Sequence, residues 1–258
     1  MTNRGVIYCA VASVLYLEAA LISAIALRQL EPEIPITIIS NLPLLKLLPL
    51  SDYRINFIFL EAKIISDNSY FSSRDIKTRL STFSPYTETL FLDADVLPLM
   101  PISPIWDYLS YTDLAMVVDR TPTVSLCDHI SYEEKNYTLQ FLPGSTTQFN
   151  SGVILWRDNF QTQALFQQWH EEWQQFQKHD QLALVRAIHS TQVFVANLPH
   201  IYNIAPYDAK PILDQKCDVN LLHCCGGLVL SGEYHQIAQR FYPQIVDYVT
   251  KISAWLSL

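Results

Sequence analysis

The feature that most constrains the fold is a regular alternation of short apolar runs with helical segments. Apolar or β-branched runs typical of buried strands lie at 5–11, 35–39, 55–60, 89–92, 114–118 and 152–156. Helical patterns lie at 13–29, 73–83, 161–176, 180–189 and 236–253. This alternation predicts an α/β fold with a mostly parallel central sheet and helices on both faces.

The chain of 258 residues shows no internal repeat and no linker rich in Gly or Ser, and it contains only 6 glycines. We therefore expect a single domain over 1–258. The periodicity is weak over 132–147, where we expect a loop or a lid over the site.

Residues 5–27 resemble a membrane anchor because they are almost all apolar and long enough to span a bilayer. Glu18 lies in the middle of this segment, Ser13 and Ser23 interrupt it, and no positive cluster flanks it. A buried strand followed by a helix explains the segment better, so we expect no transmembrane segment.

Charge and cysteine usage indicate the surroundings of the protein. The formal charge is −8, which argues against nucleic acid or an anionic membrane as partner and favours a divalent cation. The five cysteines form no Cys-x-x-Cys pair. We expect them to be reduced thiols in a cytoplasmic protein.

The strongest local motif is Asp93-Ala94-Asp95 at the end of the apolar run 89–92. Residues two apart in an extended segment point the same way, so both carboxylates can reach one hard cation. Open α/β sheets bind ligands at this carboxyl edge. The turn after the first strand, residues 10–14, has no glycine, which argues against a dinucleotide-binding fold.

Two metal-dependent classes of enzyme place an Asp-x-Asp pair after a strand. A phosphohydrolase of the haloacid-dehalogenase type would use Asp93 as a nucleophile, but it expects the motif near the N-terminus and a Gly-Asp-x-x-x-Asp pair downstream. Neither is present. A nucleotide-sugar glycosyltransferase of the GT-A fold would instead use both carboxylates to hold a cation on the donor diphosphate.

Further motifs resemble glycosyltransferase family 8, the group of glycogenin and bacterial galactosyltransferases. The family segments are "PY…LYLDAD", "FNSGVMLIN", "DQDALN", "LP..YN" and "HYxG". The matching stretches, in the family's order, are Pro85-Tyr86 with 90–95, then 149–155, Asp180-Gln181 with Ala183-Leu184, Leu198-Pro199 with Tyr202-Asn203, and 223–226. The resemblance implies a single Rossmann-like GT-A domain, with nucleotide binding in about 1–100 and the sugar and acceptor in about 101–258.

The resemblance implies a metal site made of Asp93, Asp95 and His223. Imidazole with two carboxylates suits Mn²⁺ better than Mg²⁺. It also implies that Asn150, Asp180 and Gln181 line the sugar and the reacting carbon. The remaining donor-binding positions it implies are Ala10, Val11, Ala12, Tyr16, Arg74, Lys77, Ala94 and Gly226. Tyr16 would stack on the base, although an aromatic on a helix face is equally consistent with the core.

Three departures from the family pattern bear on function. Ser13 and Val14 occupy the region of the usual Asp or Asn that reads the base, which leaves uridine specificity open. Leu182 replaces the last carboxylate of the "DQD" motif. The segment 226–230 has no phosphate-binding lysine, so either Lys77, Lys210 or Lys216 would have to assist the metal, or the metal alone would hold the leaving group.

The resemblance thus predicts transfer of a hexosyl unit from a nucleotide diphosphate sugar to a hydroxyl acceptor. A UDP-sugar is the expected donor, and the sequence does not identify the acceptor. It favours retention of configuration. A relative that binds nucleotide sugars without turnover is the alternative, because the lysine after His223 is missing.

Overall fold

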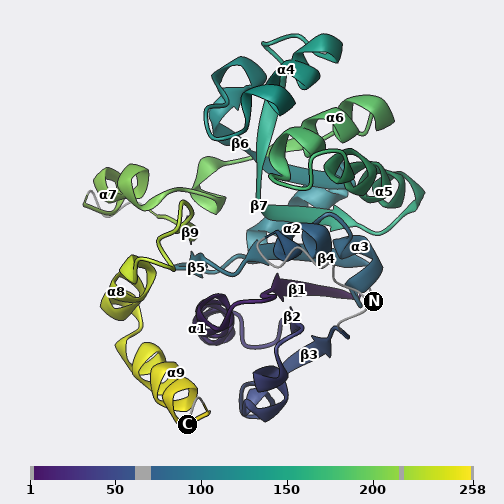
Figure 1. The fold of residues 1–258 in the computed structure, drawn as a ribbon. Coiled ribbons are helices and arrows are strands. Elements are labelled where there is room, and N and C mark those ends of the chain that lie inside the picture. The colour runs from purple at the N-terminus through teal and green to yellow at the C-terminus, as the bar shows by residue number, and fades with distance from the viewer. Residues whose placement is uncertain (1–2, 62–70, 215–217, 257–258) are drawn as a thin grey trace.

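A computed structural model describes residues 3–61, 71–214 and 218–256 of the chain. Its centre is a seven-stranded sheet in the order β3-β2-β1-β4-β7-β6-β8, and a small two-stranded sheet pairs β5 with β9 (Figure 1). The strands are β1 (Arg4–Cys9), β2 (Ile36–Ser40), β3 (Ile55–Phe59), β4 (Glu88–Asp93), β5 (Val96–Pro98), β6 (Leu114–Thr123), β7 (Thr147–Arg157), β8 (Ala196–Leu198) and β9 (Leu221–His223).

The sheet is mostly parallel, as predicted. Strands β3, β2, β1 and β4 run in one direction, β7 is antiparallel to both β4 and β6, and β8 is parallel to β6. The register places Cys9 opposite Asp93. The carboxyl ends of β1 and β4 therefore meet at one edge of the sheet, where open α/β sheets bind ligands.

Helices cover both faces of the sheet, as predicted. Helices α1, α8 and α9 lie on one face, and α2, α3, α5 and α6 on the other (Figure 1). The helices are α1 (Val14–Leu30), α2 (Ser72–Lys77), α3 (Leu80–Phe83), α4 (Tyr132–Phe141), α5 (Phe160–Gln174), α6 (Gln181–Thr191), α7 (Pro206–Asp214), α8 (Glu233–Phe241) and α9 (Pro243–Leu256).

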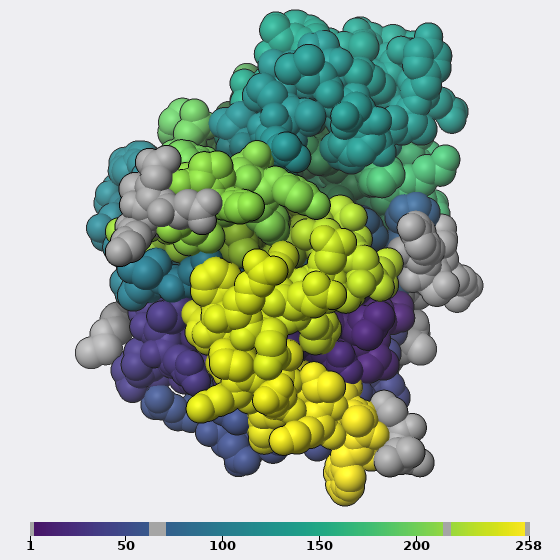
Figure 2. Space-filling view, turned by 90° about the vertical axis from the view of Figure 1, so that its left-hand side faces the viewer, coloured from purple at the N-terminus to yellow at the C-terminus, as the bar shows by residue number. Residues whose placement is uncertain are grey.

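The apolar character of α1 has a structural cause. Its residues 19–27 are all buried, because the helix lies between the sheet and the C-terminal helices α8 and α9. Figure 2 shows the C-terminal segment, in yellow, spread over the centre and lower part of this face, with the teal segment around α4 protruding at the top. None of the helices within the described residues is long and apolar enough to cross a membrane.

The structure corrects several predicted elements. The stretch 132–147 is helix α4 followed by a loop, not a loop throughout. Ser131 caps this helix by accepting a hydrogen bond from the Glu134 amide. The segment 236–253 holds two helices because Pro243 begins a new one, and 73–83 holds two short ones. The sequence patterns did not reveal β5, β8 or α7, and both of these strands are only three residues long.

The four cysteines within the described residues, Cys9, Cys127, Cys224 and Cys225, are free thiols. Cys217 lies outside the described residues. A reducing compartment remains a prediction.

Candidate active site

Pairing between β5 and β9 brings distant residues together at the end of β4. Asp93 is the last residue of β4, and β5 begins at Val96 immediately after Asp95. Strand β9 runs antiparallel to β5 and places His223 opposite Val96. The Cys224 amide then donates to the Asp95 carbonyl over 2.9 Å. Backbone pairing thus fixes His223 beside the two carboxylates.

The side chains of these three residues converge. His223 Nε2 lies 3.3 Å from Asp95 Oδ1 and 3.8 Å from Asp93 Oδ2. One ligand atom from each residue lies within 4.8 Å of the other two. Donors that share one ion at right angles, each about 2.0–2.2 Å from it, lie about 3 Å apart. The donor set therefore fits a single divalent cation.

The His223 ring is held from behind by two contacts. Its Nδ1 donates to Asn203 Oδ1 over 2.8 Å, which leaves Nε2 facing the carboxylates. The ring also lies directly against Gly152, where an added Cβ would come within 3.0 Å of three ring atoms. Glycine at this position in β7 is thus required by the histidine.

Lys77 on α2 supplies a positive charge beside the carboxylates. Its Nζ lies 2.8 Å from Asp93 Oδ2 and 3.7 Å from Asp180 Oδ2. Burial would lower the pKa of Lys77, but Asp93 and Asp180 outweigh it and raise this pKa. Burial raises the pKa of Asp93, with help from Asp95 and against the charge of Lys77. The Lys77 ammonium alone therefore does not offset the burial of Asp93 and its repulsion from Asp95, and a divalent cation beside Asp93 would be stabilised.

His223 is drawn toward its charged form by the same carboxylates. Burial would lower the pKa of this imidazole, but Asp95 and then Asp93 outweigh the burial and raise it. A bound cation would take the place of that proton between the two carboxylates.

Asp180 and Gln181 lie at the start of α6, next to Lys77. Burial opposes ionisation of Asp180, yet Lys77, Arg74 and a hydrogen bond from Ser151 hold its pKa below the ordinary value. Ser151 Oγ donates to Asp180 Oδ2 over 2.7 Å. Asp180 is therefore a buried, ionised carboxylate 3.7 Å from the Lys77 ammonium.

His129, in the loop before α4, contacts the Gln181 side chain. Its Nε2 lies 3.0 Å from Gln181 Oε1. The Cys127 sulfur raises the pKa of His129 to about 9, with a smaller contribution from the Gln181 oxygen and against the effect of burial. Because an amide oxygen only accepts hydrogen bonds, His129 Nε2 donates to Gln181 Oε1. Gln181 Nε2 is buried and has no hydrogen-bond partner among the described residues. It is a buried donor that the protein itself leaves unpaired.

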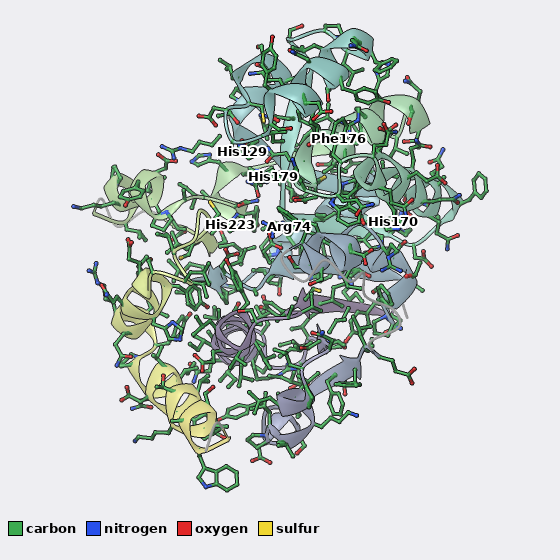
Figure 3. All side chains as sticks on the ribbon, viewed as in Figure 1. Arg74, His129, His170, Phe176, His179 and His223 are labelled. Atoms are coloured by element: carbon green, nitrogen blue, oxygen red, sulfur yellow. The ribbon has the colours of Figure 1, made fainter. Side chains whose placement is uncertain are left out.

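Arg74 and His179 lie next to this group. Figure 3 shows His223, Arg74, His179 and His129 near the middle of the molecule, whereas His170 lies away from them toward α3 and α5. The rings of His129 and His179 meet edge to face at 5.8 Å. The Arg74 guanidinium lies 5.7 Å from the centre of the Phe71 ring. These contacts place positive and aromatic side chains beside Asp180.

The turn after β1 is poor in polar side chains. Ala10 and Val11 are buried, and Ala12 is exposed with a left-handed φ of 63°. The Ala12 amide donates to Asn41 Oδ1 over 2.8 Å. Tyr16 is half-buried and packs against the larger core cluster. Either role considered for Tyr16 remains a prediction.

Ala94 and Gly226, two other predicted donor positions, lie next to the candidate metal ligands in the sequence. Ala94 is buried between the two aspartates, and Gly226 is exposed in the turn after His223 with a φ of 75°. Lys210 is exposed on α7. Lys216 lies outside the described residues. Of Lys77 and Lys210, the two candidate lysines within the described residues, the structure places Lys77 against Asp93.

Sequence reasoning assigned no role to several residues of this site. Asn203 stands in a quoted motif, and its position before the His223 segment was the available signal. Ser151 and Gly152 stand in another quoted motif, again without an assigned role. The remaining residues, which carried no motif, are Asn41, Asp119 and His129.

Comparisons with known proteins identify the family and the fold that this chain is similar to. The sequence model of the nucleotide-diphospho-sugar transferase family matches residues 87–214. The structure of galactosyltransferase LgtC with donor and acceptor sugar analogues is similar, with a TM-score of 0.64 at 16% identity over 97% of this chain and 95% of that one. A search of curated protein sequences finds no match.

Two further structures share the fold. The glycosyltransferase GlyE of Streptococcus pneumoniae matches with a TM-score of 0.59 at 14% identity, over 98% of this chain and 64% of that one. Mouse xyloside xylosyltransferase 1 matches with a TM-score of 0.52 at 12% identity, over 85% and 97%.

The fold and the matched segment define a glycosyltransferase with the GT-A architecture. Residues 87–214, almost half of the chain, match the nucleotide-diphospho-sugar transferase family, which confirms the resemblance drawn from the motifs. The phosphohydrolase alternative is thereby set aside.

Proposed function

We propose that the protein transfers a hexosyl unit from a nucleotide diphosphate sugar to a hydroxyl acceptor in a metal-dependent reaction that retains configuration. The observation that carries this proposal is the convergence of Asp93, Asp95 and His223 beside Lys77 and Asp180. A divalent cation there, Mn²⁺ in preference to Mg²⁺, would offset the charge that develops on the departing diphosphate.

The other residues of the site would bind and orient the sugar. Asp180 is ionised and would accept hydrogen bonds from sugar hydroxyls. Gln181 would turn its unpartnered Nε2 toward the donor near the anomeric carbon. Asn150 would contribute to the same pocket from β7. Lys77, with Arg74, would neutralise diphosphate oxygens in place of the lysine missing after His223.

Retention would follow from attack of the acceptor hydroxyl on the face that the diphosphate leaves, with a leaving-group oxygen taking the acceptor proton. The nucleotide would lie along Ala10, Val11, Ala12 and Tyr16, with Ala94 and Gly226 beside the diphosphate. A UDP-sugar is the first donor to test. The acceptor is a hydroxyl compound of unknown identity.

The test is hydrolysis of labelled UDP-glucose and UDP-galactose with Mn²⁺ and no acceptor. We expect slow release of free sugar that requires Mn²⁺ and disappears in Asp95→Asn. Mn²⁺-dependent stabilisation by UDP in a melting experiment should accompany it, because a ligand stabilises the state that binds it. Release of inorganic phosphate from simple phosphate esters, lost in Asp93→Asn, would contradict the proposal.

A second function is favoured by one observation, the glycines at 226 and 227 where a phosphate-binding lysine is expected. A protein that binds nucleotide sugars without turning them over would show the same melting shift. It would release no sugar with any donor or acceptor. Product formation therefore separates the two functions.

A further inference from the structure

A chain of amide side chains connects His223 to the carboxylate of Asp119 on β6. His223 Nδ1 donates to Asn203 Oδ1 over 2.8 Å, and Asn203 Nδ2 donates to Asn150 Oδ1 over 2.9 Å. Asn150 Nδ2 in turn donates to Asp119 Oδ2 over 2.9 Å. The first and last residues are 104 positions apart in the sequence (223 − 119).

The two ends of this chain determine its direction. Carboxylate oxygens only accept hydrogen bonds, so Asn150 must present its Nδ2 to Asp119. Its Oδ1 then faces the other way and must accept from Asn203. Asn203 therefore turns Oδ1 toward the ring of His223, which can satisfy that oxygen only with a proton on Nδ1.

An independent contact supports the same orientation of Asn150. The backbone amide of Gly152 donates to Asn150 Oδ1 over 2.9 Å. A backbone N–H cannot accept, so a flipped Asn150 would place two donors against each other. Asp119 is held in turn by Thr121, whose amide and hydroxyl both donate to Oδ1 over 2.8 Å.

We propose that Asp119, Asn150 and Asn203 are positioning residues that keep the His223 proton on Nδ1 and the Nε2 lone pair directed at the metal position. The inference rests on the proposed metal site. Asp93 and Asp95 alone would draw a proton onto Nε2, which lies 3.3 Å from Asp95 Oδ1 and would then be unable to bind a cation. The relay opposes this tautomer.

The first test measures Mn²⁺ affinity by electron paramagnetic resonance, with no sugar present. Asn203→Leu removes the acceptor for Nδ1–H, and we expect Mn²⁺ affinity to fall about 10- to 100-fold, as for other residues behind a metal ligand. Asn203→Asp keeps that acceptor but loses the donor to Asn150 Oδ1, so it should retain more Mn²⁺ affinity than Asn203→Leu without reaching wild type. Asn197→Ala, an exposed amide on β8, is the matched control and should not change affinity.

Asp119→Asn tests the far end of the relay without changing the volume of the side chain. The Thr121 amide and hydroxyl require an oxygen at the Oδ1 position, so the new Nδ2 would face Asn150 Nδ2 and oppose the orientation that the Gly152 amide supports. We expect a smaller loss of Mn²⁺ affinity than in Asn203→Leu, with an unchanged melting temperature. The loss should occur although Asp119 does not touch the metal residues.

The second test observes the proton itself. In ¹⁵N spectra of the Mg²⁺-loaded protein we expect a protected His223 Nδ1–H signal in wild type and in Asn203→Asp, and its loss in Asn203→Leu. A folded Asn203→Leu or Asp119→Asn protein that binds Mn²⁺ as tightly as wild type would overturn the relay while leaving the proposed function intact. A wild-type protein that binds no Mn²⁺ would overturn both.

Discussion

The two ends of the proposed donor site are built in opposite ways, although both lie at the same edge of the sheet. At the end of β4, side chains from β4, β9, α2 and the start of α6 converge. Asp93, Asp180 and His223 each form a side-chain hydrogen bond there. At the end of β1, Ala10, Val11 and Ala12 offer backbone and methyl groups, with Asn41 as their polar side-chain contact among the described residues.

This difference indicates which kinds of groups would bind each part of the donor. Directional charges would hold the diphosphate and the sugar. The base would meet apolar surface and backbone groups, which distinguish one base from another weakly. The metal end should therefore be sensitive to single substitutions and the base end tolerant of them.

The largest effect is expected from Lys77→Met. Removal of the ammonium leaves Asp93 and Asp180 close together without their cation, and loss of one partner of a buried ion pair costs about 3 kcal/mol of folding free energy. Urea unfolding without metal measures it. Mn²⁺ should restore more stability to this variant than to wild type, and equal unfolding curves for Lys77→Met and wild type would refute the central role of Lys77. Lys210→Met on the exposed face of α7 is the control.

Asp95→Asn comes next. It removes one of the two proposed carboxylate ligands, so Mn²⁺-dependent stabilisation by UDP should disappear while the apo fold is kept. At a hundredfold excess of ligand over Kd that stabilisation amounts to about 2.7 kcal/mol, which thermal melting detects easily. Asp107→Asn, on an exposed position, should melt like wild type. If UDP with Mn²⁺ still raises the melting temperature of Asp95→Asn as in wild type, Asp95 is not a metal ligand.

Gly152→Ala should have an intermediate effect. The new methyl group overlaps the His223 ring, which must move away from Asp93 and Asp95. Mn²⁺ affinity should drop about tenfold or more, as when the support of a metal ligand is removed. Gly144→Ala is the matched control, since its Cβ would lie 3.2 Å from the nearest atom, on Ser125. Calorimetric Mn²⁺ titration of both variants decides the matter, and equal affinities would show that the ring adapts.

The smallest effect is expected from Asn41→Ala at the base end. The variant loses the hydrogen bond that Asn41 Oδ1 accepts from the Ala12 amide, worth about 1 kcal/mol. Affinity for UDP and for GDP, measured with Mn²⁺ by calorimetry, should fall by similar small factors in both cases. A large loss confined to one nucleotide would show that Asn41 reads the base, and the contrast between the two ends would then be weaker than proposed.

The sequence was informative where local pattern determines structure. The apolar run before Asp93 predicts a buried strand from its own residues, and the spacing of Asp93 and Asp95 predicts their shared direction. The partners of these residues follow from tertiary pairing that leaves little local pattern. Strand β9 has only three residues, and its pairing with β5 is what places His223.

Helix α4 shows why periodicity failed over 132–147. Its buried face includes Glu134 and Thr138 instead of apolar residues. Both contact Arg186 on α6, at 3.4 and 2.7 Å. These partners lie 52 and 48 residues further along the chain. A pattern of local hydrophobicity therefore predicts that Glu134 and Thr138 are exposed, although Arg186 allows them to be buried.

The β5–β9 pairing also determines when the site can form during synthesis. Asp95 and His223 are 128 residues apart (223 − 95). At about 5–20 residues per second, a ribosome needs roughly 6 to 26 seconds to make that interval. The parallel strands β1 to β4 can assemble during this delay, with Lys77 as the cation beside Asp93. The proposed cation site would then be completed only when β9 adds its three residues beside β5.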